Sequence, residues 1–298
     1  MKYRLVAVDG ADLPLWTAGA HLDIVVAPEF LRQYSMCGNP SDRSCYEIAV
    51  LLEPEGRGGS KLMQRIFEEG RRVFVSKPIN HFALEASASL SLLFGGGIGV
   101  TPMIAFAHEL DSAGRHFKLM YSASTQASAA FDSDFEGQPW AKKCSKHYSD
   151  QGSRLDITSV VPPYEAGIHI YVCGPNAYMT SILDQARFMG YPDIALHAEF
   201  FAVPDMPDWV NFPFEIELND GQKVSVSVDQ SASDALIAAG ISVDVKCSDG
   251  LCGVCKCTLI SGVVEHRDFV LSAAQRETTM ILCQSRAFHK NAVLKLDI

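Results

Sequence analysis

The chain has 298 residues, 48% of them hydrophobic and 20% charged, which predicts a globular protein of two or three domains rather than a single core. A formal net charge of -10 without a basic patch argues against nucleic acid as a partner. No apolar run could span a membrane, no signal-peptide pattern opens the chain, and nine scattered cysteines do not suggest a disulfide framework, so we expect a cytoplasmic protein with reduced thiols.

Residues 1–84 are predicted to form a first, all-β domain. Short runs of alternating apolar residues predict strands over 3–8, 20–26 and 46–52, a pattern typical of a barrel or sandwich. The tetrapeptide Arg32-Gln33-Tyr34-Ser35 stands between the last two of these strands.

A glycine-rich turn over 56–60 precedes an amphipathic helix predicted over 61–67. Ser60 is a suitable N-cap, and the glycines allow backbone N–H groups to approach a ligand closely. With Arg57 as a charged group beside them, this helix start is a candidate anion site. Taken alone, such a sequence is more often only a turn and a cap.

Residues 85–203 alternate strand and helix, which predicts a parallel α/β domain. A buried strand over 89–94 runs into the glycine-rich turn 95–102, and glycines at such a turn suit close approach of a nucleotide phosphate. Their order is not the G-x-G-x-x-G of a Rossmann domain. A second strand, 168–172, ends in Cys173-Gly174-Pro175, where parallel sheets bind ligands, although Cys173 is equally well explained by packing.

Residues 204–212 have the composition of a linker, and residues 213–298 are predicted to form a third domain. Alternating residues predict a β-hairpin over 214–228, and a short helix follows over 231–239. Together with returning strands, these elements predict a small β-grasp domain.

Four cysteines in this last domain have the spacing of cluster ligands. Cys247, Cys252 and Cys255 form C-x4-C-x2-C, and Cys283 follows well downstream, which is the pattern of a plant-type 2Fe-2S ferredoxin. Gly250 and Gly253 supply the backbone freedom that a loop around the cluster requires. A structural zinc site would show two close cysteine pairs or a histidine pair instead. The remaining thiol, Cys257, is expected to face away and to serve packing.

Taken together, the motifs make the chain resemble the phthalate dioxygenase reductase family, which includes vanillate demethylase reductases. The resemblance rests on five segments spread over nearly the whole chain: Arg-x-Tyr-Ser at 32–35, Arg-Gly-Gly-Ser at 57–60, Gly-Gly-Ile-Gly-Val-Thr-Pro at 96–102, Cys-Gly-Pro at 173–175 and the ferredoxin loop at the C-terminus. It implies a multidomain protein with an antiparallel β-barrel flavin domain, a parallel α/β nucleotide domain and an α+β β-grasp ferredoxin domain.

The resemblance also implies roles for single residues. Arg32, Arg57, Gly58, Gly59 and Ser60 would hold the phosphate of FMN, Tyr34 would pack on the flavin, and Gln33 and Ser35 would bond its ribityl chain and ring edge. Ala49, Val50 and Leu51 would border the ring through backbone groups, Thr101 would lie close to it, and Phe201 would cover one face. Gly97, Gly99, Cys173, Gly174 and Pro175 would position the nicotinamide nucleotide. Ser35, Thr101 and Cys173 would position the reacting groups rather than act as acids or bases.

The sequence departs from the family pattern in two places. Relatives usually have one more strand before the equivalent of Met1, so the barrel is expected to lack a strand. No arginine occurs in Ser122-Ala123-Ser124-Thr125, where relatives often carry one nearby to meet a 2'-phosphate, which favours NADH over NADPH.

The resemblance therefore implies an NADH-dependent reductase that passes electrons through FMN and a 2Fe-2S cluster to a Rieske-type aromatic-ring oxygenase or O-demethylase. We expect it to be monomeric. Three alternatives stay open: a reductase for another acceptor, such as a cytochrome P450 or a carnitine oxygenase, a non-catalytic iron-sulfur carrier, and a zinc-bound interaction module.

Overall fold

The computed structural model describes residues 1–28, 30–54, 56, 58–204 and 209–298. The chain divides into two compact units, Met1–Ala198 and Glu199–Ile298, and each is described by itself. Among the described residues, no helix is both long and apolar enough to cross a membrane.

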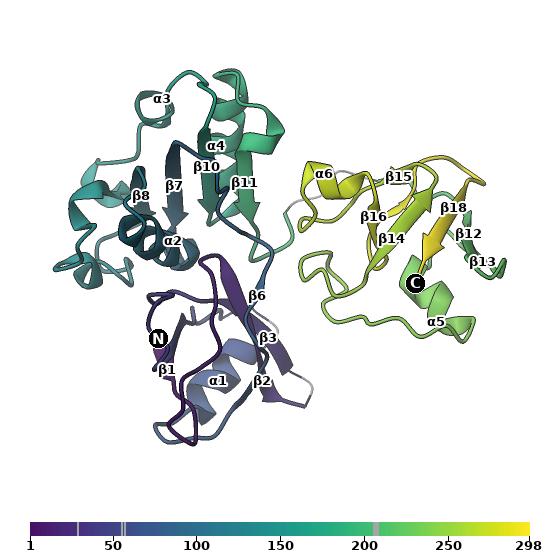
Figure 1. The fold of residues 1–298 in the computed structure, drawn as a ribbon, viewed down its shortest axis with the longest axis horizontal. Coiled ribbons are helices and arrows are strands. Elements are labelled where there is room, and N and C mark those ends of the chain that lie inside the picture. Colours follow the sequence, from purple (N-terminus) through teal and green to yellow (C-terminus); the bar gives the residue numbers. More distant parts are fainter. Residues whose placement is uncertain (29, 55, 57, 205–208) are drawn as a thin grey trace. The chain divides into compact units, whose positions relative to one another are not determined.

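The first unit begins with antiparallel strands (Figure 1). They are β1 (Lys2–Leu5), β2 (Ala20–Ala27), β3 (Phe30–Ser35), β4 (Tyr46–Ala49), β5 (Phe74–Val75) and β6 (Ile79–Asn80). β2 pairs with β3, β5 and β6, and β1 pairs with β4. A single bridge between Met36 and Ile48 joins the two sheets. The three predicted strands are present, while the described strands form two sheets rather than one closed barrel.

Helix α1 (Gly59–Ile66) packs against β2 and β3. Its N-cap is Gly58, which takes a left-handed conformation with φ of 89°. The prediction of Ser60 as the N-cap is therefore wrong. Ser60 lies inside the first turn, and its hydroxyl accepts a hydrogen bond from the Glu53 backbone N–H at 3.1 Å. Glycine replaces the side-chain cap here because the turn needs a positive φ, which costs glycine little.

A five-stranded sheet fills the rest of the first unit. Its strands are β7 (Leu90–Gly96), β8 (Phe117–Ala123), β9 (Cys144–Tyr148), β10 (Ile168–Cys173) and β11 (Leu196–Glu199). Its helices are α2 (Val100–Ser112), α3 (Ile157–Val160) and α4 (Asn176–Phe188), and the short 3-10 turns are η1 (Gly97–Gly99), η2 (Ser133–Phe135), η3 (Ala141–Lys143), η4 (Ser149–Gln151) and η5 (Asp193–Ala195).

The strand order is β11-β10-β7-β8-β9, and β10, β7, β8 and β9 run parallel. From the central β7 the chain moves to β8 on one side and later returns to β10 on the other. Because such crossovers are right-handed, α2 and α4 belong on opposite faces of the sheet. The predicted α/β domain is confirmed, and its topological switch point lies between the carboxyl ends of β7 and β10.

One hydrophobic core joins the antiparallel strands of the first unit to α2 and to one part of the five-stranded sheet. The rings of Phe82, Phe106 and Tyr171 contact one another with centroids 5.1 to 5.9 Å apart. The carboxylate of Glu109 on α2 accepts a hydrogen bond of 2.7 Å from the Ala18 N–H. Residues before and after 84 therefore pack as one compact body, and the predicted domain boundary there stays a prediction.

The described part of the second unit consists of a mixed five-stranded sheet, a pair of short strands and two helices. The strands are β12 (Phe214–Leu218), β13 (Lys223–Val226), β14 (Lys256–Ser261), β15 (Val264–Glu265), β16 (Thr279–Ile281), β17 (Arg286–Ala287) and β18 (Val293–Asp297), and the helices are α5 (Ala232–Ala238) and α6 (Ala273–Arg276).

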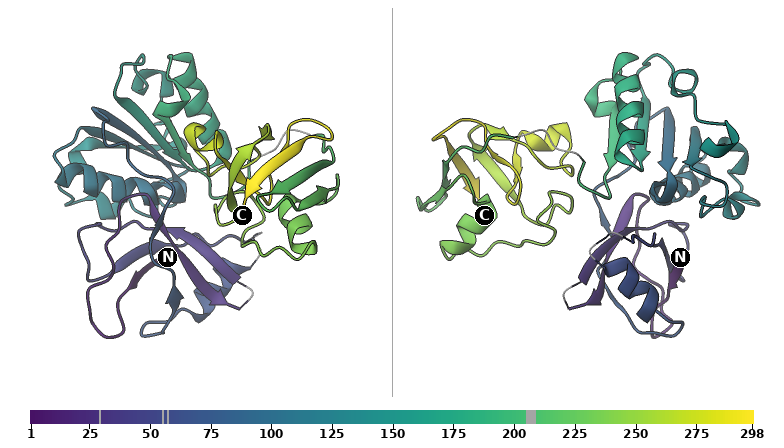
Figure 2. Two further views of the ribbon diagram at one scale, coloured as in Figure 1. Left: turned by 45° about the vertical axis from the view of Figure 1, so that its right-hand side comes forward. Right: turned by 180° about the vertical axis from the view of Figure 1, so that it is seen from behind.

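The order in the larger sheet is β13-β12-β18-β14-β16, with β12 and β18 parallel and the other pairs antiparallel. α5 lies to one side of this sheet (Figure 2) and contacts β13. Ser231 caps α5 by accepting the Asp234 N–H, as its position predicts. The predicted hairpin and helix are thus confirmed, and the long loop from α5 to β14 carries the cysteine motif.

Candidate functional site

The four predicted cluster ligands gather at one place in the second unit. Cys252, Cys255 and Cys283 are buried, and Cys247 is half-buried. The loop follows a path that needs unusual backbone angles, with φ of 74° at Gly250 and 68° at Gly253. These two values confirm the expected need for glycine in the loop.

The thiols of these cysteines are close enough to interact with one another. Hydrogen bonds from Cys252 and Cys283 lower the pKa of Cys247, and a hydrogen bond from Cys283 lowers the pKa of Cys255, while the same contacts raise the pKa values of the two donors. The Asp249 N–H also points at the Cys247 sulfur, 3.4 Å away.

Cys247 interacts with both Cys252 and Cys283, and Cys255 interacts with Cys283, so the four thiols form one connected group. Among the residues that the structure describes, no three His, Cys, Asp or Glu side chains are arranged to hold a single metal ion. The four thiols, with their C-x4-C-x2-C spacing and a distant fourth member, fit the ligand set of a plant-type 2Fe-2S cluster. Cys257 is buried beside Met280, and burial raises the pKa of its thiol to about 12, in agreement with its predicted packing role.

Two glycine turns meet at the switch point of the parallel sheet. A Cβ at Gly99 would collide with the carbonyl group of Cys173, and one at Gly174 would lie 2.9 Å from the Gly96 Cα. Gly97 has φ of 56° and open space where its Cβ would lie. The close approach therefore explains the glycines at 99 and 174, and Gly97 leaves backbone accessible to a ligand.

The other residues of this region are placed as follows. Thr101 is buried in the first turn of α2, where its hydroxyl donates to the Ile98 carbonyl at 3.0 Å. Cys173 has no exposed surface, so its backbone rather than its thiol lines the turn. Pro175 is the N-cap of α4. Gly96 is a functional candidate that the sequence did not single out, since its Cβ would lie 2.8 Å from the Tyr178 ring.

Arg32 lies against the N-terminus of α1. A Cβ at Gly59 would collide with its guanidinium group, and the guanidinium also stacks 4.9 Å from the centre of the Phe30 ring. The first turn of α1 contains no acidic side chain. A cation therefore lies beside the backbone N–H groups of a helix start, an arrangement that is suited to an anion. Arg57 lies outside the described residues.

Strand pairing divides the rest of the tetrapeptide between two faces. Tyr34 shares the face of Arg32 and packs against the core, and burial raises its pKa. Gln33 and Ser35 lie on the opposite face. The Gln33 side-chain amide contacts Asp23 at 3.1 Å and His21 at 2.9 Å. Nothing in the sequence pointed to His21 and Asp23 as site residues, because only the pairing of β2 with β3 brings them next to Gln33.

The backbone that follows β4 is hydrogen-bonded to the first residue of the chain. The backbone N–H and carbonyl of Val50 both pair with Met1, at 2.8 and 2.9 Å. Ala49 is buried and Leu51 is exposed. Phe201 belongs to the second unit and is 44% exposed, so its predicted role over the flavin stays a prediction.

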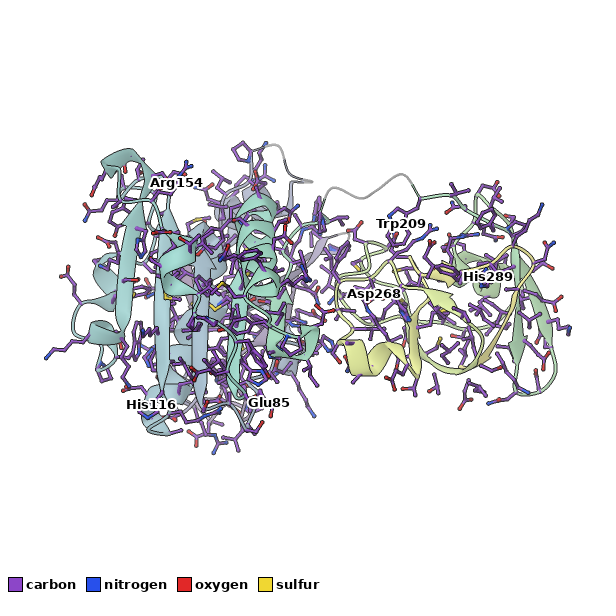
Figure 3. The ribbon with its side chains drawn as sticks, turned by 90° about the horizontal axis from the view of Figure 1, so that it is seen from above. Glu85, His116, Arg154, Trp209, Asp268 and His289 are labelled. Atoms are coloured by element: carbon purple, nitrogen blue, oxygen red, sulfur yellow. The ribbon has the colours of Figure 1, made fainter. Side chains whose placement is uncertain are left out.

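An anchor for the linker was also missed from the sequence. The Arg267 guanidinium stacks 4.3 Å from the centre of the Trp209 ring and donates to Asn211, while it pairs with Glu265. Trp209 is seen among the side chains of the second unit (Figure 3). The last part of the predicted linker is therefore bound to the ferredoxin domain.

Comparisons with known proteins agree with this arrangement. Residues 216–288 match the family model of the 2Fe-2S iron-sulfur cluster binding domain. The whole chain is 38% identical to vanillate O-demethylase oxidoreductase of a Pseudomonas species, over 95% of that protein. It is 34% identical to phthalate dioxygenase reductase of Burkholderia cepacia, over 92% of its length, and a solved structure of phthalate dioxygenase reductase matches with a TM-score of 0.69 over 100% of this chain and 92% of that one.

A third similar protein is an intact type IV self-sufficient cytochrome P450 monooxygenase, whose solved structure matches with a TM-score of 0.89 at 33% identity. The match covers 99% of this chain but only 38% of that protein. The chain belongs to the phthalate dioxygenase reductase family. It is an oxidoreductase with a 2Fe-2S ferredoxin domain and with flavin- and nicotinamide-binding domains similar to those of phthalate dioxygenase reductase.

Proposed function

We propose that this protein takes electrons from NADH through FMN to its 2Fe-2S cluster and delivers them to a terminal oxygenase. The observation that carries the proposal is that one chain of this family combines a helix start beside an arginine, two closely packed glycine turns at the end of a parallel sheet and a four-cysteine loop. Bound flavin would accept a hydride and release single electrons, and the cluster would carry them one at a time.

The residues around α1 would bind the cofactor phosphate. Arg32, the N–H groups of Gly58 and Gly59, and Ser60 surround a helix start that fits a terminal monophosphate, which favours FMN. Ser35 and Thr101 would then position the ring of the flavin. Arg57 belongs to the same proposal through the family motif.

The paired glycine turns would bind the nicotinamide nucleotide. Gly97 would permit close approach of its phosphates, Gly99 would keep the turn packed against Cys173, and Gly174 and Pro175 would line the opposite side of the switch point. Residues 122–125 at the end of β8 include no arginine to meet a 2'-phosphate, which supports NADH over NADPH.

We place the functional domains at 1–84 for FMN, 85–203 for NADH and 213–298 for the cluster, joined by the linker 204–212. The protein would work as a monomer in the cytoplasm, where the cysteines that do not bind the cluster would stay reduced. Sedimentation velocity tests the monomer directly.

The acceptor we favour is a Rieske-type oxygenase that acts on an aromatic ring or removes an O-methyl group. The similarity to vanillate O-demethylase oxidoreductase supports this choice. Electron flow would be downhill, since plant-type clusters have potentials near about -400 mV and Rieske centres lie at about -150 mV or above. A cytochrome P450 is the second candidate, because the chain is also similar to a part, 38% in length, of a self-sufficient cytochrome P450 monooxygenase.

Purified protein and purified oxygenases test the proposal. Acid extraction should release FMN, and turnover with NADH should be faster with a Rieske O-demethylase than with a P450. Equal or better turnover with the P450 would reverse the order of the acceptors. Protein that contains iron but no flavin would instead be an iron-sulfur carrier.

The cluster assignment has its own variant. Cys252→Ser should lose the iron-sulfur absorption bands and keep those of flavin, because one iron loses a thiolate ligand. The matched control is Cys257→Ala, a buried thiol of the same domain, which should keep both sets of bands. Loss of the cluster in the control as well would contradict the ligand set.

A further inference from the structure

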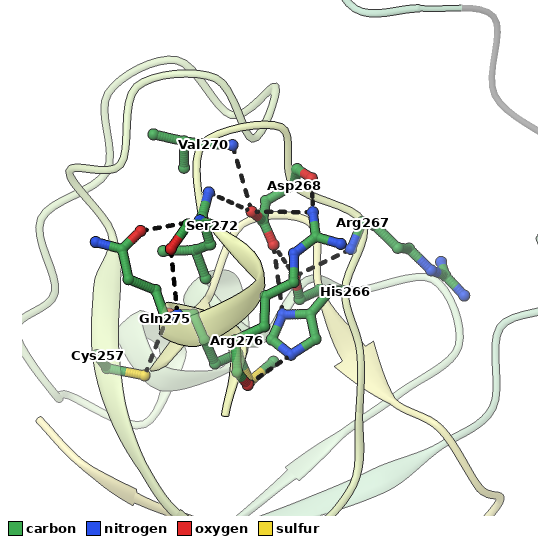
Figure 4. Close-up of polar contacts among 11 residues, drawn as sticks. Cys257, His266, Arg267, Asp268, Val270, Ser272, Gln275 and Arg276 are labelled. Carbon is green, nitrogen blue, oxygen red and sulfur yellow. Dashed lines mark hydrogen bonds and ion pairs between the residues drawn. The ribbon is translucent and has the colours of Figure 1, made fainter. Parts of the chain in front are cut away.

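A buried carboxylate lies beside the cysteine loop. Asp268 follows β15, and its side chain has no exposed surface. One carboxylate oxygen accepts the N–H groups of Leu271 at 2.9 Å and Val270 at 3.4 Å. The other accepts the hydroxyl of Ser285 at 3.3 Å. Figure 4 shows Asp268 next to Val270, Arg276 and His266.

Two further side chains approach the carboxylate: Arg276, whose guanidinium is 3.7 Å away, and His266, whose Nδ1 is 3.5 Å away. Burial acts to raise the pKa of Asp268, but the contacts with His266, the Leu271 N–H and Arg276 outweigh it and hold the pKa below its usual value. Replacing a buried carboxylate with this many partners costs free energy of folding, because each partner loses its hydrogen bond or ion pair.

Asp268 is connected to the loop that carries three of the cysteines. The next residue, Phe269, donates its N–H to the Gly250 carbonyl at 3.1 Å. A Cβ at Gly250 would lie 3.3 Å from the Asp268 Cα, so the two backbones are in direct contact. The carboxylate holds residues 268–271 in a tight turn. It thereby fixes the backbone that Gly250 contacts.

Asp268 is also connected to the fourth cysteine. Ser285, two residues after Cys283, donates its hydroxyl to Asp268 and accepts the Arg267 N–H at 3.2 Å. Gln284 reaches from the same segment to the Ser248 carbonyl at 2.7 Å. Asp268 is thus bonded or packed to both stretches of chain that supply thiols.

We propose that Asp268 is a positioning residue for the 2Fe-2S cluster, which ties the loop of Cys247, Cys252 and Cys255 to the segment of Cys283. The inference rests on the cluster-binding role proposed above. Residues beyond the ligands orient them and tune the potential of a metal centre. Arg276 and His266 would contribute indirectly, because they hold the Asp268 carboxylate in place.

The test compares Asp268→Asn with Asp220→Asn, the same change in the exposed turn of the hairpin in the same domain. The amide keeps the size of the side chain but removes its charge and places a donor against the Leu271 N–H or the Ser285 hydroxyl. Cluster loss to an iron chelator is followed by visible absorbance, and the midpoint potential is measured by anaerobic dithionite titration, which needs neither NADH nor flavin.

We expect Asp268→Asn to lose its cluster about tenfold faster or more and to have a higher midpoint potential, because a nearby negative charge is gone. Asp220→Asn should match the wild type in both measurements. A folded Asp268→Asn with wild-type loss rate and potential would overturn the inference.

Should Asp268→Asn fail to fold, Ser285→Ala decides, because it removes the hydroxyl that joins the Cys283 segment to the Asp268 carboxylate and to the Arg267 N–H, and it leaves the carboxylate charge in place. Faster cluster loss in Ser285→Ala supports the inference, and a wild-type rate overturns it. Wild-type protein without iron would contradict the proposed function itself, whereas iron-loaded wild type with unaffected variants contradicts only the role of Asp268.

Discussion

At the scale of single residues, the nucleotide turn depends on missing side chains. Gly99 and Gly174 allow the strand ends of β7 and β10 to touch through backbone atoms. Any Cβ at Gly99 would force the Cys173 carbonyl away, and overpacking of this kind typically costs about 1–3 kcal/mol. The turn is therefore sensitive to the smallest possible substitution.

Gly99→Ala should raise the KM for NADH about tenfold, because the displaced turn no longer accepts the nucleotide closely. Gly114→Ala is the control: its φ of 65° makes the substitution strained, but nothing lies near its Cβ and it follows the far end of α2. Steady-state kinetics and thermal melting separate the two effects. An unchanged KM in Gly99→Ala, or an equal rise in the control, would count against the site.

The residue scale also shows what the sequence could reveal. The ligands Cys247, Cys252 and Cys255 were predictable because their spacing is local and chemical. Asp268 was not, because its contact with Gly250 joins segments that sequence spacing does not relate. Ser60 was assigned to the N-cap from residue preference alone, and the left-handed angle of Gly58 moved the helix start.

At the scale of elements, the site on α1 combines a helix start with a strand. Arg32 comes from β3 and Gly59 from α1, and their contact places a guanidinium over the N–H groups of the first turn. The motif was recognisable in the sequence, but the meeting of two separate elements required the fold. The predicted barrel shows the same limit, since local alternation predicts strands but not which edges close.

Arg32→Gln should weaken retention of FMN by about 10- to 100-fold in Kd, because a charge-assisted hydrogen bond contributes roughly 1.5–3 kcal/mol. Arg43→Gln removes an exposed arginine that pairs with Asp12 in the same unit and should leave FMN binding unchanged. Titration of flavin-stripped protein by fluorescence quenching measures both. Equal affinity in Arg32→Gln and wild type would refute the phosphate site on α1.

At the scale of the whole molecule, a histidine pair makes stability depend on pH. Nδ1 of His169 lies 2.9 Å from Nε2 of His197, and the His197 ring stacks 4.4 Å from the Tyr171 ring. Burial and the neighbouring His169 lower the pKa of His197 to about 4, against the pull of Glu85. Burial lowers the pKa of His169 as well, with Glu85 opposing the shift and Arg115 adding to it.

The folded state therefore disfavours protonation of these two histidines, whereas in the unfolded chain they bind protons below about pH 6.5. The stabilisation from this pair is complete above that pH and is lost as the pH falls towards about 4. His197→Phe keeps a ring on Tyr171 but cannot take up a proton. As the pH falls, thermal melting should show that the Tm of the variant rises relative to that of the wild type. The expected rise is about 2–4 °C for each kcal/mol of unfolding free energy that the wild type loses. A constant difference in Tm from pH 8 to pH 4.5 would show that the pair does not titrate as described.

The central claim is that two electrons enter at the nucleotide turn and leave singly from the four-cysteine loop. Addition of NADH to the purified protein without oxygen, followed by visible absorption and electron paramagnetic resonance, tests it most directly. The account predicts that the flavin and iron-sulfur bands bleach together and that the signal of a reduced 2Fe-2S cluster appears. A protein that contains both cofactors, yet whose cluster stays oxidised after NADH has reduced the flavin, would contradict it.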